Sequence, residues 1–389
     1  MDLIDILIIL TVVAAGVRGH QAGFFREGLS FGGFILGIII GAAVAPYVAH
    51  FGSTPLTKSL LTFATVVLSA AVLGGIGETV GFRIADLFKQ IHLRWFDQGG
   101  GIVMGACVAL LSAWIVGNMF SSSPFVALNS ELQRSVILQG LNKELHPPTA
   151  LIARIKGEFQ VDGFPQVFTG LEPIAPGPVQ ELGQGPVTMA AKLDEASVVK
   201  IVGAGCGGIK EGTGFIAANN LVMTNAHVVA GIAHPEIVDQ SGSHTTTVVL
   251  YDPNLDIAIL RTSGLTGKPL SLHNSIAGRG QQGVVLGYPE DGPYTADAAA
   301  VLEKLTAEGQ NIYDSQEVTR DVYSLQTTIK PGNSGGPLVG TDGSVWGVVF
   351  ASSSTDSSIG YALTSQETLY DLNQAIGRYD PVSTQACNQ

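Results

Sequence analysis

Three short segments of the sequence carry side chains that could together hydrolyse an amide bond. They contain a histidine, an aspartate and a serine in that order, namely His227, Asp256 and Ser334. A serine hydroxyl is a weak nucleophile at neutral pH, so it needs a histidine that takes its proton and later passes it to the leaving group. A buried aspartate orients that histidine and stabilises its protonated ring. The residue types and their order therefore predict a catalytic triad.

The serine lies in residues 331–337, Pro-Gly-Asn-Ser-Gly-Gly-Pro. This run satisfies G-x-S-x-G, the nucleophile elbow of α/β-hydrolases, but in that fold the catalytic histidine follows the serine. The last histidine of the chain is His273, so that class is excluded unless the catalytic order is permuted. We expect the backbone amides of Gly332 and Ser334 to form an oxyanion hole, which contributes about 3 kcal/mol per donor.

Two other aspartates, Asp239 and Asp252, compete with Asp256 for the role of triad acid. Asp252 precedes Pro253 and is typical of a turn residue. Asp256 directly adjoins the apolar run 257–260, which favours it as the acid.

The sequence also contains patterns that could suggest a dinucleotide or a metal ion as ligand, but neither is supported by the neighbouring residues. Gly203, Gly205 and Gly208 spell G-x-G-x-x-G, but a Gly-rich segment rather than a helix follows, which argues against dinucleotide binding. The other histidines after residue 230 lack the spacing of metal ligands: His234, His244 and His273. We therefore predict no metal and no cofactor.

Short β-branched runs between Gly, Asn and Asp turns predict an all-β domain over residues 192–389. The runs are 197–202, 214–217, 221–224, 246–250, 257–260, 283–286, 321–326, 337–339 and 345–350. Many short strands of this kind are typical of a barrel or a sandwich. His227 follows the third run and Asp256 opens the fifth.

Residues 1–121 have the composition of a membrane domain. Four apolar stretches cover residues 3–17, 28–49, 60–80 and 99–120. The last three are long enough to cross a hydrocarbon core of about 30 Å, and the first is a short span. The second and fourth stretches contain glycines four residues apart, which favour close helix packing within one bundle over dimerisation. These glycines are Gly33, Gly37, Gly41, Gly101 and Gly105.

Basic residues in the loops predict the orientation of this domain. Arg18 and Arg26 lie between the first two spans, and Arg83, Lys89 and Arg94 lie between the last two. Loops rich in Lys and Arg stay in the cytoplasm. With four spans, the chain after residue 121 is then expected outside the plasma membrane.

Residues 122–191 are expected to connect the two domains. Apolar spacing predicts an amphipathic helix over 129–145, and the Pro/Gly-rich remainder is typical of an extended tether. The formal net charge of −12 lies entirely in residues 122–389, because acidic and basic residues are equal in number before them. An acidic domain without a Lys/Arg cluster argues against nucleic-acid binding.

Cys206 and Cys387 lie near the two ends of the all-β domain. In an oxidising compartment a disulfide between them would tie these ends together. The alternative is a pair of unrelated thiols.

The three segments around His227, Asp256 and Ser334 resemble the trypsin-like serine proteases, and most of all their Deg-type bacterial branch. The segment from Asp2 through the Gly-rich second span resembles the colicin-V-production family. Together with the cysteine pair, the chain resembles the actinobacterial, MarP-like family of membrane-anchored acid-resistance serine proteases.

This resemblance implies an α-helical membrane domain of four transmembrane helices followed by an all-β, chymotrypsin-like double β-barrel. It also implies a specificity pocket without a charge at its base, and hence a preference for uncharged side chains before the cleaved bond. The implied lining residues are Thr328, Ile329, Phe350, Ala351 and Ser352.

The resulting hypothesis is a serine endopeptidase that acts on cell-envelope or secreted proteins, with a role in resistance to acid or oxidative stress. Its partners would be those protein substrates and the lipid bilayer. One alternative is a catalytically idle protease fold that senses or binds. Another is a channel-like or transporter-like membrane protein regulated by the protease domain, against which the apparent absence of paired charges in the spans argues.

Overall fold

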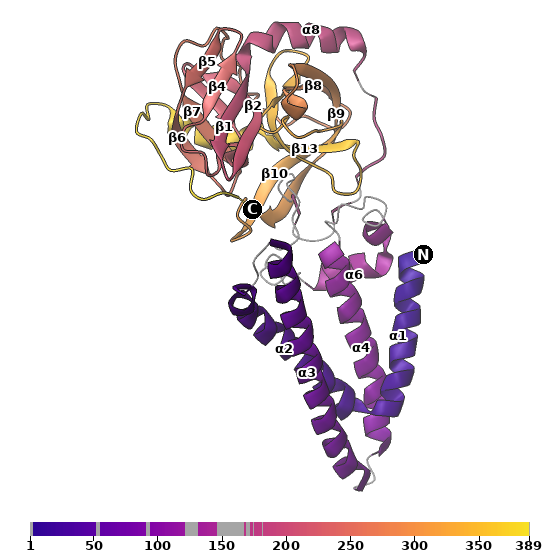
Figure 1. Cartoon of the computed structure of the whole chain (residues 1–389). Helices are drawn as coiled ribbons and strands as arrows, with labels where there is room; N and C mark the ends of the chain where they lie inside the picture. The colour runs from indigo at the N-terminus through magenta and orange to yellow at the C-terminus, as the bar shows by residue number, and fades with distance from the viewer. Residues whose placement is uncertain are drawn as a thin grey trace. The chain divides into compact units, whose positions relative to one another are not determined.

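The computed structural model describes residues 3–51, 55–90, 94–120, 131–145, 167–168, 172–173, 175–180 and 182–388. The chain forms two compact units. One comprises Met1–Asn118 and Arg134–Leu145, and the other comprises Met119–Gln133 and His146–Gln389. Figure 1 shows long helices in the first unit and strands in the second.

The first unit contains four long helices. They are α1 (Leu3–Ala22), α2 (Phe24–Ala49), α3 (Pro55–Gln90) and α4 (Arg94–Phe120). Each contains a segment long and apolar enough to cross a bilayer: Leu3–Ala22, Phe24–Ala45, Ala64–Asp86 and Trp95–Asn118. The four predicted spans are confirmed, and the first is a full helix of 20 residues rather than a short one.

The predicted glycine contacts lie within the bundle. A methyl group built on Gly33 would come within 2.2 Å of the Leu73 carbonyl oxygen, and one on Gly37 within 2.5 Å of Ala70 Cα, so α2 lies directly against α3. A methyl group on Gly105 would come within 2.3 Å of the Ala15 carbonyl oxygen. The absence of a side chain therefore permits the close helix approach that the sequence predicts.

One ion pair joins α2 to α3, between Arg26 of the predicted basic loop and Glu78 near the end of the third predicted span. Arg26 Nε of α2 donates to Glu78 Oε1 of α3 at 3.1 Å. The two residues are 52 positions apart, so their pairing depends on how α2 packs against α3 and could not be seen in the sequence.

The first unit also contains the short helix α6 (Val136–Glu144). Its N-cap residue Ser135 donates to Asp5 Oδ1 of α1 at 2.6 Å, and the Ile137 amide donates to the same oxygen at 3.2 Å. A carboxylate at a helix N-terminus satisfies free amides and opposes the helix dipole. Residues 131–134 are helical as well, so the helix predicted over 129–145 is interrupted at Ser135. Residues 129 and 130 lie outside the described residues.

The second unit consists of two antiparallel sheets. The first has seven strands in the order β5-β4-β1-β2-β3-β7-β6, and the second is a closed barrel in the order β10-β13-β12-β11-β8-β9. The strands of the first sheet are β1 (Val198–Gly205), β2 (Gly208–Ala218), β3 (Leu221–Thr224), β4 (Glu236–Asp239), β5 (Gly242–Thr245), β6 (Thr247–Asp252) and β7 (Ile257–Arg261). Those of the barrel are β8 (Gln282–Gly287), β9 (Thr295–Gln310), β10 (Glu317–Gln326), β11 (Pro337–Gly340), β12 (Val345–Ser352) and β13 (Ile359–Thr364).

These sheets form the chymotrypsin-like fold that was expected, and each of the nine predicted runs overlaps a strand, with only Ser197 and Thr246 outside. The core joins both sheets, because Phe215 and Met223 of the first belong to one buried cluster with Leu286 and Phe350 of the second. Two helices flank the sheets, α8 (Gln184–Asp194) and α10 (Ser365–Ala375). The Tyr294 hydroxyl donates to the Ala191 carbonyl of α8 at 3.0 Å, which fastens this helix to the barrel.

Candidate active site

Strand pairing in the first sheet brings His227 and Asp256 together. Strands β3 and β7 run antiparallel with Thr224 opposite Ala258. His227 lies three residues beyond Thr224, in the one-turn helix α9 (Ala226–Val229), and Asp256 lies two residues before Ala258. Both side chains therefore lie at the same end of the strand pair.

Both carboxylate oxygens of Asp256 contact His227. Asp256 Oδ2 lies 2.7 Å from His227 Nδ1, and Oδ1 accepts from the His227 backbone amide at 2.9 Å. The Asp256 side chain is fully buried, whereas 13% of the His227 side chain is exposed. A carboxylate at Nδ1 keeps the proton there and leaves Nε2 as the basic nitrogen, as a triad requires.

The loop that carries Asp256 is held in an unusual backbone conformation. Asp256 has φ = 62°, in the left-handed region that few side chains adopt. The Asn225 side chain donates to the Asp256 carbonyl at 2.9 Å, and the buried Arg320 guanidinium donates to the Asn254 carbonyl at 2.7 Å. Burial lowers the pKa of Arg320 while the charges of Asp256 and Asp252 oppose that shift. Sequence analysis missed Arg320, whose partner Asn254 is 66 positions away in the turn before β7.

The two competing aspartates have local partners instead. Asp252 Oδ1 accepts from the amides of Asn254 and Leu255 at 2.7 and 3.1 Å, which is the turn role expected for it. Asp239 Oδ1 accepts from the Ser241 amide at 2.8 Å and lies 2.9 Å from His244 Nε2. Within the part of the chain that the structure describes, neither of them hydrogen-bonds to His227, so the geometry favours Asp256 as the partner of this histidine.

Ser334 lies in the turn before β11, and its backbone is fixed against the first sheet. The Thr213 amide donates to the Ser334 carbonyl at 2.8 Å. Gly335 has φ = 85°, and a methyl group built on it would come within 2.3 Å of Thr224 Oγ1 and 3.1 Å of the Asn225 amide nitrogen. The residue after Ser334 thus lies against the residue two positions before His227, so the serine and histidine loops are neighbours.

Thr213 of β2 connects the two sheets at this turn, and sequence analysis missed it. Its hydroxyl donates to the Gly332 carbonyl at 2.6 Å and accepts from the Tyr288 amide at 2.9 Å. The Thr224 hydroxyl in turn donates to the Thr213 carbonyl at 2.7 Å. The only signal was the Gly-Thr-Gly run at 212–214, which was considered only as part of a Gly-rich connection.

The predicted oxyanion donors lie in the same turn. Gly332 has φ = 94° and packs against the Tyr288 carbonyl, so this position requires glycine. Among the described residues, neither the Gly332 nor the Ser334 amide donates to another backbone carbonyl. Both N–H groups therefore remain available to a substrate oxygen. Their role as an oxyanion hole stays a prediction.

The five predicted pocket residues differ in exposure. Thr328 is exposed and Ser352 is partly exposed, while Ile329, Phe350 and Ala351 are buried. The two sides of the predicted pocket are joined through the turn after β12, because the Thr327 amide donates to the Ser358 carbonyl at 2.8 Å. The pocket itself stays a prediction.

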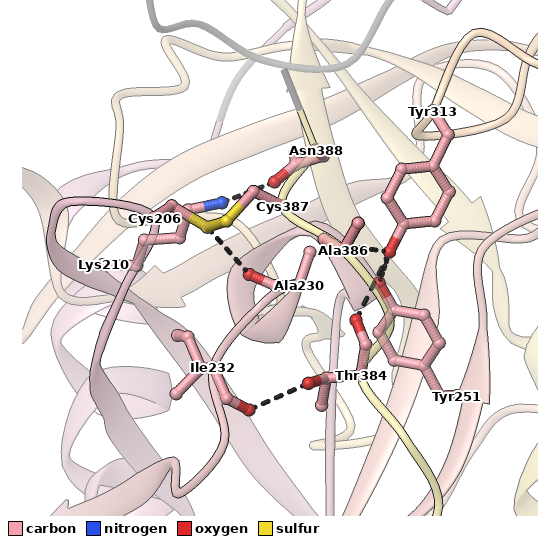
Figure 2. The surroundings of a disulfide bond; sticks show 10 residues. All are labelled: Cys206, Lys210, Ala230, Ile232, Tyr251, Tyr313, Thr384, Ala386, Cys387 and Asn388. Atoms are coloured by element: carbon pink, nitrogen blue, oxygen red, sulfur yellow. Dashed lines mark hydrogen bonds between the residues drawn. A yellow bond between two sulfur atoms is a disulfide. The ribbon is translucent and has the colours of Figure 1, made fainter.

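A disulfide joins Cys206 to Cys387, which are 181 positions apart, as the sequence suggested (Figure 2). It lies beside the segment that follows α9. Gly231, four residues after His227, has φ = 70°, and a methyl group there would come within 2.7 Å of both sulfur atoms. The Gly231 amide donates to the Thr384 carbonyl at 3.2 Å, so the C-terminal segment is fastened next to the histidine helix.

Within the described residues, no group of three or more His, Cys, Asp or Glu side chains is arranged to hold a metal ion.

Comparison with known proteins identifies the family of this chain. Residues 212–348, which contain His227, Asp256 and Ser334, match the trypsin-like peptidase domain, and residues 4–145 match the colicin V production protein. The serine protease Rv3671c of Mycobacterium tuberculosis is 34% identical over 396 residues, which cover 99% of this chain and 98% of the relative. This chain belongs to the Rv3671c family of serine proteases. The crystal structure of the active form of Rv3671c protease has 39% identity and a TM-score of 0.53, and it covers 56% of this chain and 99% of that chain.

Other serine proteases match a smaller part of the chain. Human serine protease HTRA4 is 35% identical over 144 residues, which cover 36% of this chain and 30% of the relative. This Rv3671c-family member is therefore a serine protease with a membrane domain, as the residues around His227, Asp256 and Ser334 predicted.

Proposed function

We propose that this protein is an extracytoplasmic endopeptidase anchored in the plasma membrane, with His227, Asp256 and Ser334 as its catalytic triad. The observation that carries this proposal is the pair of contacts between the Asp256 carboxylate and His227, beside a serine turn fixed to the same loop. That arrangement favours the triad over the hypothesis of an idle protease fold.

In the proposed mechanism, His227 Nε2 takes the Ser334 hydroxyl proton as the oxygen attacks the substrate carbonyl. The Gly332 and Ser334 amides donate to the oxyanion of the tetrahedral intermediate. The protonated ring then passes its proton to the leaving amine. Water repeats the sequence on the acyl-enzyme, and Asp256 stabilises the imidazolium throughout. No cofactor takes part.

The proposed substrates are proteins of the cell envelope or secreted proteins, because those are what a membrane-anchored protease outside the cytoplasm meets. A contribution to survival of acid or oxidative stress is part of the same proposal. The test compares extracytoplasmic protein fragments from cells carrying the wild-type protein and the Ser334→Ala variant. We expect defined fragments that depend on Ser334, and identical fragment sets would contradict an endopeptidase role.

The location of the protease domain gives a separate prediction. In a Cys107→Ser background, a membrane-impermeant thiol reagent should modify a Ser123→Cys probe in intact cells, because the basic loops hold the other side in the cytoplasm. A His92→Cys probe, next to Arg94, should react only after the cells are opened. The inverse pattern would place the protease domain in the cytoplasm.

A further inference from the structure

A segment upstream of α8, which was expected to be part of an extended tether, packs against the barrel. This upstream segment is defined here by its described residues 167–168, 172–173, 175–180 and 182. Val167 and Leu182 are buried in the same cluster as Phe350, Ala351 and Tyr361. Its backbone is also held by side chains of the barrel unit: the Val179 amide donates to Gln326, and the carbonyls of Gly177 and Gln180 accept from Arg279 and Gln282.

One carboxylate in this segment, that of Glu172, is deeply buried and fully engaged. Only 7% of the residue is exposed. Its Oε2 accepts from the Ser354 amide at 3.0 Å and from the Ser354 hydroxyl at 2.9 Å, and its Oε1 accepts from the Tyr361 hydroxyl at 2.5 Å. A buried carboxylate is tolerated only with such partners, and bonds to a charged acceptor are stronger than neutral ones.

The partners of Glu172 adjoin two residues of the predicted specificity pocket, Ser352 along the chain and Ala351 across the sheet. Ser354 lies in the turn of residues 353–358 that follows Ser352, and Tyr361 pairs with Ala351 across strands β12 and β13. The same turn fastens the opposite wall through the Thr327 amide, and a methyl group on Gly360 would come within 2.3 Å of Ile329 Cγ1. One turn therefore connects both predicted walls.

The aromatic contact strengthens this arrangement. The Phe168 ring packs edge-on against the Tyr361 ring, with centroids 5.5 Å apart. Burial raises the pKa of Tyr361 and the nearby Glu172 carboxylate raises it further, so the tyrosine remains a hydrogen-bond donor. Both oxygens of the Glu172 carboxylate thus accept hydrogen bonds from groups of the protease itself.

We propose that Glu172 is a positioning residue for substrate specificity: it holds the 353–358 turn and Tyr361, and thereby fixes the two walls that receive the substrate side chain before the cleaved bond. The proposal rests on the proposed function. The contact that carries this role joins two residues 182 positions apart, Glu172 and Ser354.

The test uses the full-length protein in detergent and peptides that differ only in the residue before the cleaved bond. Glu172→Gln keeps the size but replaces a charged acceptor with an amide. We expect kcat/KM for the best peptide to fall about tenfold, mostly through KM, which corresponds to the loss of one charge-assisted bond. The ratio between the best and worst peptides should shrink by a similar factor. Labelling of Ser334 by a small fluorophosphonate should stay within about twofold of wild type, because this reagent does not need the pocket.

The matched control is Gln282→Ala, which removes another bond between the upstream segment and the barrel, away from the turn. It should leave both kcat/KM and the peptide ratio unchanged. If Glu172→Gln fails to fold, Ser354→Ala and Tyr361→Phe should each change the peptide ratio in the same direction by a smaller factor. An unchanged ratio between the best and worst peptides in a folded variant would overturn the proposal. It would also be overturned if kcat/KM fell equally for every peptide and labelling of Ser334 slowed as well. Absence of labelling in the wild-type protein would instead contradict the triad.

Discussion

Replacement of Ser334 or His227 by alanine is expected to lower kcat by about a million-fold while the protein remains folded. Without His227, no base takes the proton of the Ser334 hydroxyl, so the serine cannot attack the substrate. Without Ser334, no nucleophile is present for His227 to activate. The members of a triad act as a unit, so the double variant should be no slower than either single variant. Peptide hydrolysis by purified full-length protein measures this.

Asp256→Asn should fold but lose about four orders of magnitude, because an amide at this position favours the wrong imidazole tautomer. The chain offers a matched control in Asp239, which contacts His244 in a similar way on an exposed hairpin. Asp239→Asn and Asp252→Asn should leave kcat nearly unchanged. Equal sensitivity at Asp252 would mean that Asp256 is not the triad acid.

Loss of the disulfide should have the second large effect, on stability rather than on chemistry. The bond closes a loop of 181 positions that contains the entire proposed triad. Chain-entropy estimates for loops of this size approach about 5 kcal/mol, which rivals the whole free energy of unfolding of a domain. Cys387→Ser should therefore lower the melting temperature markedly, and Cys107→Ser, which alters the free and exposed cysteine, should not.

The same variant should weaken catalysis indirectly. Beyond the disulfide, Thr384 accepts from the Gly231 amide, and the Thr384 hydroxyl donates to the Ile232 carbonyl at 2.9 Å (Figure 2). Release of the C-terminal segment frees the residues that follow α9 and thereby the position of His227. Melting curves and kcat of oxidised and reduced protein test this. An unchanged melting temperature after reduction would contradict the structural role of the bond.

The sequence was sufficient to predict the features that depend on local patterns. Long apolar stretches predict spans from length alone, and the three short segments predict His227, Asp256 and Ser334 from residue type and order. The strand runs were found because β-branched residues cluster between turn residues. Such signals are contained within a few neighbouring positions.

Strand β9 shows why other elements were missed. Its residues 295–310 are rich in Ala, Glu, Leu and Lys, which favour helices. In the structure the strand pairs with β8 on one side and β10 on the other, and Ala299 and Ala300 are buried in the barrel. Ladder hydrogen bonds and burial along sixteen residues outweigh a helix preference of a fraction of a kcal/mol per residue.

Contacts between residues that are far apart in the sequence could not be predicted from it either. Glu172 looked like part of a Pro/Gly-rich tether, and only the fold brings it to Ser354 and Tyr361. Thr213 and Arg320 were missed for the same reason, because their partners Gly332, Tyr288 and Asn254 are distant in the sequence. Neither composition nor spacing carries information about contacts of this kind.

The most direct test of the proposed triad is fluorophosphonate labelling of the full-length protein, with the modified residue located by mass spectrometry. The reagent forms an adduct only with a serine that a neighbouring base activates. We predict one rapid adduct, on Ser334, that is absent from Ser334→Ala and is lost in His227→Ala but not in His244→Ala. Labelling of Ser334 at the same rate in His227→Ala, or no adduct on Ser334 in the wild-type protein, would contradict the account.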